Sequence, residues 1–160
     1  MAIGTNALID FFGTQDLITH ATTTGAITDG SFSVVQAADV LPWTNDDDAK
    51  AAIMVLKCRW TTTAPTDGSV INVHIRPLNV QSTNDTPVPT AITPSVLTNF
   101  MADGDVAADT YVHLITPVFA LPNSYTSAVY EFYLENKTGQ SITTAWTWYI
   151  TPLAVGPHPA

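Results

Sequence analysis

Apolar and polar residues alternate along much of the chain, which is the pattern of a half-buried β-strand. Every second residue is apolar in the four clearest segments, which are 52–60, 69–76, 129–136 and 146–151. Successive side chains of a strand point to opposite faces of its sheet, so one face of each segment is expected to be buried. Weaker alternation predicts three more strands, at 16–23, 31–36 and 111–121.

The same alternation assigns side chains to the core. Those expected to be buried are Met54, Leu56, Trp60, Ile71, Val73, Tyr130, Phe132, Leu134, Trp146 and Trp148. Tyr133 and Tyr149 fall at the opposite positions of their strands, and Phe11 and Phe12 precede the first expected strand. We expect these four aromatic residues to belong to a contact surface instead of the core.

Turn-forming residues separate the expected strands. They are Asp29-Gly30, Asn45 to Asp48, Pro65 to Gly68, Asp103-Gly104, Pro122 to Ser124 and Lys137 to Gly139. Short strands with frequent turns predict an all-β fold, either an antiparallel β-sandwich or a barrel. No linker divides the 160 residues, so we expect a single domain, 1–160.

Three segments depart from simple alternation. Residues 79–101 contain three prolines, which favours a long connection with a short helical turn at 94–100. The apolar residues within 7–12 have the spacing of one helix face, so this segment is expected to form either a short helix or an arm. Pro117 interrupts the segment 111–121, which favours an edge strand or a bulge there.

Composition narrows the possible partners. Charged residues make up 12% of the chain, and five Lys and Arg against 14 Asp and Glu give a formal net charge of −9. Nucleic acids and anionic membrane surfaces are bound by clustered cations, so we expect neither partner. The 25 threonines suit strands, because a β-branched residue with a hydroxyl fits a solvated strand face.

The sequence also bears on the compartment. No segment has the roughly 18 uninterrupted apolar residues of a membrane helix. The first residues lack the basic and apolar regions of a secretory signal peptide, so we expect synthesis in a cytoplasm. The single cysteine, Cys58, excludes an internal disulfide and is expected to be a small buried apolar residue.

Metal-binding patterns are incomplete. The four histidines, His20, His74, His113 and His158, have no zinc-binding spacing. Among the acidic residues, Asp103 and Asp105 match the first and third ligand positions of an EF-hand, but the later ligand positions are apolar. Another kind of calcium site, at Asp46–Asp48 or Asp103–Asp109, stays open. The alternative is a pair of solvated acidic turns, the first capping a helical turn near Ala49.

No arrangement of residues predicts catalysis. Glu131 and Glu135 are the only glutamates, and four residues of strand place them about 13 Å apart on one face, too far for a glycosidase pair. The motifs of serine hydrolases, P-loops and dinucleotide-binding folds are absent. We therefore expect no catalytic, cofactor-binding or metal-binding residues.

Four segments resemble one family of viral proteins. They are 130–152 (YEFYLENKTGQSITTAWTWYITP), 11–16 (FFGTQD), 29–32 (DGSF) and 43–47 (WTNDD). Together they resemble the small structural proteins of tailed bacteriophages that decorate or cement capsids. The resemblance implies a jelly-roll sandwich, a homotrimer, and attachment to the major capsid protein on the outside of the shell.

A protein of that kind needs rigid β surfaces, free strand edges and arms that reach its neighbours. We expect an N-terminal arm at 1–14 and a C-terminal tail at 153–160. Contacts that are weak one by one become strong when they repeat over a shell. The expected location is the virion, assembled in the host cytoplasm.

Three functions remain open from the sequence. They are a capsid decoration protein, a carbohydrate-binding module of a phage fibre or adhesin, and a tail or baseplate subunit. Trp146 and Trp148 share one strand face, where they either stack on sugars or fill the core. The core is the expectation for both, which leaves Tyr133 and Tyr149 as the better candidates for a contact.

Overall fold

A computed structural model describes residues 8–18, 25–33, 41–46, 48–78, 96–122 and 128–157. All the regular structure in these ranges is β-strand, which agrees with the all-β expectation. They hold no helix that is long and apolar enough to cross a membrane. The strands are β1 (Leu8–Phe12), β2 (Asp16–Ile18), β3 (Trp43–Asn45), β4 (Ala51–Cys58), β5 (Val70–Leu78), β6 (Val96–Met101), β7 (Val112–Ile115), β8 (Phe119–Ala120), β9 (Ala128–Lys137) and β10 (Thr147–Pro157).

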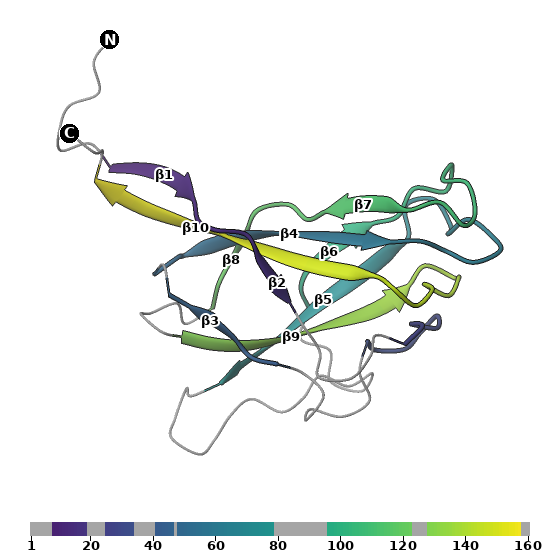
Figure 1. The fold of residues 1–160 in the computed structure, drawn as a ribbon, viewed down its shortest axis with the longest axis horizontal. Helices are drawn as coiled ribbons and strands as arrows, with labels where there is room; N and C mark the ends of the chain where they lie inside the picture. Colours follow the sequence, from purple (N-terminus) through teal and green to yellow (C-terminus); the bar gives the residue numbers. More distant parts are fainter. Residues whose placement is uncertain are drawn as a thin grey trace, which may run out of the picture.

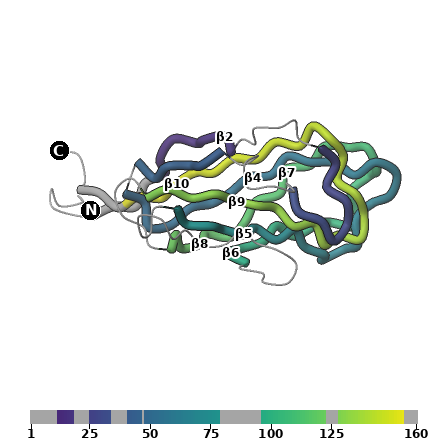
Figure 2. The backbone as a smooth tube through the Cα atoms, turned by 90° about the horizontal axis from the view of Figure 1, so that it is seen from below, coloured from purple at the N-terminus to yellow at the C-terminus, as the bar shows by residue number. Residues whose placement is uncertain are grey.

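Two antiparallel sheets form a sandwich, whose layers are separated in the edge view (Figure 1, Figure 2). The first sheet has the order β1-β10-β4-β7, with β2 also paired to β10 and β8 also paired to β4. The second sheet has the order β3-β9-β5-β6. Since β1 and β2 both lie along β10, and β7 and β8 both along β4, the sandwich has two layers of four strand positions. This is the arrangement of a jelly roll.

The first sheet has two breaks, one between β7 and β8 and one between β1 and β2, and a proline lies beside each of them. Pro117 separates β7 from β8 and lacks the N–H that a ladder needs. Next to it, the N–H of Thr116 donates to Met54 O, and its Oγ1 accepts the Met54 N–H, both at 3.0 Å. In the break between β1 and β2, the N–H of Gly13 still donates to Pro152 O at 2.8 Å. The sheet therefore stays continuous across both breaks.

The core between the sheets is aromatic. Phe132 of β9 and Trp148 of β10 meet edge to face across the two sheets, with ring centroids 6.1 Å apart. Trp43 stacks on Tyr130 within the second sheet, at 6.0 Å. All ten side chains that the alternation assigns to the core are at most 2% exposed.

Buried tryptophans also need polar partners, because an unpaired indole N–H costs free energy. The indole N–H of Trp43 donates to Asp16 Oδ2 (2.9 Å), that of Trp60 to Thr138 Oγ1 (3.1 Å) and that of Trp146 to Gly25 O (3.0 Å). The first pair links the two sheets, and the other two attach loops to the core.

The three helical expectations are wrong. Residues 96–101 form β6 instead of a helical turn, because they pair with β5. Residues 8–12 form β1, because β10 offers the backbone partners that a short helical spacing lacks. Ala49 begins no helical turn, because the side chain of Asn45 bonds its N–H and its carbonyl, at 3.0 and 2.9 Å.

Several expected segments are described only in part. Of 16–23, residues 16–18 form β2, and of 31–36, Phe32 makes an isolated bridge to β9. Residues 19–23 and 34–36 of these segments lie outside the described ranges, as do 79–95 of the long connection.

The two expected arms pair with each other where they are described. β1 runs antiparallel to residues 153–157 of β10, whereas β4, on the other side of β10, pairs only as far as Leu153. Residues 154–157 therefore pair with β1 alone among the described strands. The two strands project from one end of the sandwich as the β1–β10 ribbon (Figure 1). They form one element in place of two separate arms.

We predict that Trp146→Ala destabilises the fold by about 3–5 kcal/mol, since it empties a buried site and leaves Gly25 O without its donor. Urea unfolding at neutral pH measures the change. Thr62→Ala, at an exposed position, is the control and should stay within about 0.5 kcal/mol. An unchanged unfolding midpoint for Trp146→Ala would contradict the packing described.

Candidate functional site

The outer face of the first sheet carries a row of apolar side chains. Leu17 of β2 lies opposite Tyr149 of β10. Tyr149 in turn lies opposite Val55 of β4, and Val55 lies opposite Ile115 of β7. Leu17 is 48% exposed and Ile115 is 62% exposed, while the two residues between them are half-buried. These four residues, here called the apolar row, cross the sheet from edge to edge.

Uncharged residues continue this surface toward the β1–β10 ribbon. Thr151 lies opposite Ile53 in the next row, and Leu153 lies opposite Phe12 at the base of the ribbon. Phe12 is 63% exposed, and Val118, in the break between β7 and β8, is 60% exposed. An exposed apolar surface of this kind marks an interaction site in a folded protein.

Positive charge gathers at the other end of the face. Lys57 Nζ and Arg59 Cζ lie 4.8 Å and 4.9 Å from the ring centroid of Tyr111, within the range of a cation–π contact. Arg59 also forms an ion pair with Asp109, at 2.7 Å. Two of the five cations of the chain thus lie at one end of this face.

Acidic side chains are missing from the middle of this face. Opposite residues 147–153 of β10, the described outward positions hold no Asp or Glu. Asp16 of β2 lies opposite Ile150, an inward position, and its carboxylate bonds Trp43 of the other sheet. For a chain with a net charge of −9, this distribution sets the face apart from the rest of the surface.

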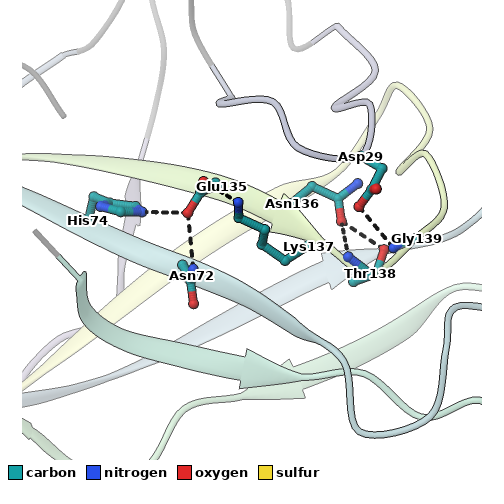
Figure 3. A network of polar contacts seen from close by, with 8 residues as sticks. All are labelled: Asp29, Asn72, His74, Glu135, Asn136, Lys137, Thr138 and Gly139. Atoms are coloured by element: carbon teal, nitrogen blue, oxygen red, sulfur yellow. Dashed lines mark hydrogen bonds and ion pairs between the residues drawn. The ribbon is translucent and has the colours of Figure 1, made fainter. Parts of the chain in front are cut away.

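The outer face of the second sheet is polar but buried. Glu135 of β9 is 3% exposed. Its Oε2 accepts from Asn72 Nδ2 and contacts His74 Nε2, both at 3.0 Å, and its Oε1 lies 3.0 Å from Lys137 Nζ (Figure 3). Phe32 covers this group with its ring edge-on to His74, at 5.2 Å between centroids.

A second carboxylate on the same face has its own partners. Glu131 Oε2 accepts from Arg76 at 2.8 Å and from the hydroxyl of Tyr133 at 2.6 Å. Burial raises the pKa of Tyr133, and the hydrogen bond to Glu131 raises it further, so the phenol stays a donor. The prediction that Tyr133 belongs to a contact surface is wrong: the side chain is 0% exposed. It lies on the outer face as the alternation indicates, but that face is not in water.

Burial and hydrogen bonding act in opposite directions on Glu135. Burial disfavours the charged form and by itself raises the pKa of a carboxyl group. Hydrogen bonds from Asn72, Lys137 and His74 favour the carboxylate and outweigh burial, so the pKa of Glu135 lies below its ordinary value. The folded protein therefore stabilises the ionised form.

Asn136, near the end of β9, and the turn that follows it hold the segment before β3 against the sandwich. Asn136 Nδ2 donates to Ile27 O at 2.8 Å. Its Oδ1 accepts the hydroxyl of Thr138 at 2.7 Å (Figure 3). The N–H of Gly139 donates to Asp29 Oδ1 at 2.9 Å, from a left-handed turn with a φ of 76°. These bonds are structural, since each satisfies a group within the fold.

The four residues expected at a contact surface have different places. Tyr133 is buried as described, and Tyr149 lies half-buried in the apolar row. Phe12 is exposed beside that row, at the base of the ribbon. Phe11 belongs to β1, but its side chain lies outside the described part. The sequence analysis did not identify Leu17, Val55 and Ile115. The available signal was the alternation, which places each of them on the outward side of its strand.

The histidines and Cys58 offer no assembled metal or nucleophile site in the described residues. His74 is bound to Glu135, His113 is exposed on β7, and His20 and His158 lie outside the described ranges. Cys58 is 0% exposed, and burial raises the pKa of its thiol to about 12.

The acidic segments form turns in their described parts. Asp103 Oδ1 accepts the N–H of Asp105 at 2.9 Å, and Asp109 pairs with Arg59. Asp47, in the segment Asp46–Asp48, lies outside the described residues. Across the described ranges, no group of three or more His, Cys, Asp or Glu residues has the geometry to hold a metal ion.

Comparisons with known proteins add little to this geometry. No protein-family model matches the chain, and no curated protein matches it. Among solved structures, the chain is similar to one from Desmodium yellow mottle tymovirus, at 10% identity over 100% of this chain and 93% of that one, with a TM-score of 0.31. A likeness this weak carries no argument about function.

We predict that Glu135→Gln destabilises the protein by about 1–3 kcal/mol at pH 7, because the charge-assisted bonds to Asn72, His74 and Lys137 are weakened. A carboxyl group with a lowered folded pKa contributes stability above its unfolded pKa, and that contribution is lost as the pH falls through the folded pKa. The difference between wild type and variant should therefore shrink below about pH 4.

Urea unfolding between pH 7 and pH 3 measures this difference. Asp105→Asn, which neutralises an exposed carboxylate, is the matched control and should change stability by less than about 0.5 kcal/mol. If the difference in unfolding free energy between wild type and Glu135→Gln is the same at pH 7 and pH 3, the role given to the ionised form of Glu135 is wrong.

Proposed function

We propose that this chain is a non-catalytic structural protein of a virus particle, and more specifically a decoration or cement protein that binds the outer surface of a capsid. The observation that carries the proposal is the uncharged outer face of the first sheet, with the apolar row at its centre. A jelly roll is used by capsid proteins, lectins and cupins alike, so the fold by itself does not choose among them.

The size of the face indicates how it is used. Seven residues of β10 and four strand positions span roughly 440 Å², at about 3.3 Å per residue and about 4.8 Å per strand. A stable interface usually takes about 800 Å² from each partner. One such face therefore gives a weak contact, which suits a protein that binds a repeating shell at many points.

The charges describe the surface on the partner. Lys57 and Arg59, the latter paired with Asp109, lie at one end of a face whose middle is uncharged, on a chain that is strongly acidic overall. The complementary site, which we assign to the major capsid protein, is an apolar patch with acidic residues at one edge. We further propose that the bound form is a homo-oligomer, with a trimer as the state that analytical ultracentrifugation should find.

The carbohydrate alternative is weaker on the same residues. Of the aromatic rings on which it depended, Tyr133, Trp146 and Trp148 are buried, and Tyr149 is half-buried in the apolar row. A tail or baseplate subunit would use the same apolar face, so the position of the protein on the particle distinguishes it from a capsid protein.

We predict that Ile115→Asp weakens binding to purified capsids of the same virus by about tenfold or more, because it places an unpaired carboxylate in the apolar row. Cosedimentation over a concentration series measures the affinity. The variant should fold normally, because Ile115 is 62% exposed.

Met101→Asp is the matched control, since Met101 is a strand residue of the other sheet that is 66% exposed. It should bind like the wild type. If the wild type does not cosediment with capsids, or if both variants bind equally well, the proposed docking face is wrong.

A further inference from the structure

The β1–β10 ribbon lacks the support that a sheet normally gives. Residues 154–157 pair with β1 alone among the described strands, so the outer part of the ribbon has only two strands (Figure 1). Two strands by themselves are marginally stable in water, whereas three or more give a stable sheet. Four of the five residues of β1 are apolar, and Phe12, whose side chain is described, is 63% exposed.

The register indicates which backbone groups of β1 are already used. Gly13 donates its N–H to Pro152 O, and backbone groups of a strand point alternately to its two sides. The N–H groups of Ile9 and Phe11 therefore point toward β10. Those of Leu8, Asp10 and Phe12 point away from it, toward the side where no described strand pairs with β1.

This edge lacks two of the usual protections. Exposed edge strands are commonly shielded by lysine, proline or bulges. The residues from 8 to 18 contain neither lysine nor proline. On the opposite edge of the same sheet, Pro117 lies in the break between β7 and β8.

We propose that the free edge of β1 accepts an extended segment of another protein as an additional antiparallel strand, with a lysine or arginine of that segment opposite Asp10. Main-chain hydrogen bonds to Leu8, Asp10 and Phe12 provide the affinity, as in other cases of strand addition. The proposal depends on the proposed function only for the identity of the partner, which would then be a shell protein.

A second copy of this chain is the less suitable occupant. If β1 paired with β1 of a second copy about a two-fold axis, the antiparallel register with the most hydrogen bonds would be centred on residue 10. It would place two aspartates directly opposite each other, and like charges in that position are unfavourable. Asp10 thus discourages self-pairing and selects a cationic partner.

The first experiment compares two variants that both remove the charge. Asp10→Val keeps the outward N–H and removes the repulsion, so its molar mass in sedimentation velocity should exceed that of the wild type at equal concentration. Asp10→Pro removes the same charge together with that N–H, and its mass should equal that of the wild type. Proline at this position leaves the bonds from Ile9 and Phe11 to β10 in place.

The second experiment uses synthetic peptides, Thr-Val-Thr-Lys-Thr-Val-Thr and its central glutamate counterpart, followed by amide shifts in NMR spectra. The lysine peptide should bind the wild type about threefold or more tightly than the glutamate peptide. It should shift the amides of Leu8, Asp10 and Phe12, and it should not bind Asp10→Pro.

Either of two results would overturn the proposal. One is a wild type that already associates through β1, which makes a second copy the occupant. The other is a wild-type protein that binds neither peptide, together with an Asp10→Val variant whose molar mass equals that of the wild type. Neither experiment contains capsids, so strand addition can fail while capsid binding through the apolar row holds, and the reverse.

Discussion

Strand β9 is buried on both of its faces, and the second sheet is arranged around that constraint. One face supplies core side chains such as Phe132, and the other carries the carboxylates of Glu131 and Glu135. Buried carboxylates are tolerated only when other groups satisfy them, and the neighbouring strand β5 supplies most of those groups, including His74 and Arg76. The register of β5 on β9 is therefore held by these polar contacts as well as by the apolar pattern. A slip of one residue would lose both at once.

The two outer faces of the sandwich consequently have different roles. On the second sheet the carboxylates of Glu131 and Glu135 are satisfied within the chain, so these charges need no partner from outside. On the first sheet Leu17 and Ile115 remain exposed, while Tyr149 and Val55 lie between them on long central strands. A contact surface built on paired strands is more rigid than one built on loops. One layer thus stabilises the fold, and the other is available for binding.

Local alternation predicted most of this fold and little of the site. Period two is enough to separate Phe132 and Trp148 from their outward neighbours, because burial on one face leaves a direct trace in the sequence. It cannot tell whether the outward face is itself covered, which is why Tyr133 was assigned to the surface although Glu131 and Phe32 lie on that side. The pairing of β1 was missed for another reason. A window of a few residues contains nothing about a partner at the far end of the chain.

That long separation has a consequence for how the protein folds. Leu8 and Pro157 are about 150 residues apart in sequence, and bringing such distant segments together costs roughly 4 kcal/mol of chain entropy. Contacts of high sequence separation form slowly, and this one becomes favourable only when β10 is already in place between β2 and β4. The ribbon is therefore among the last parts to form. A chain that is still growing, or trapped partway, does not present this edge of β1.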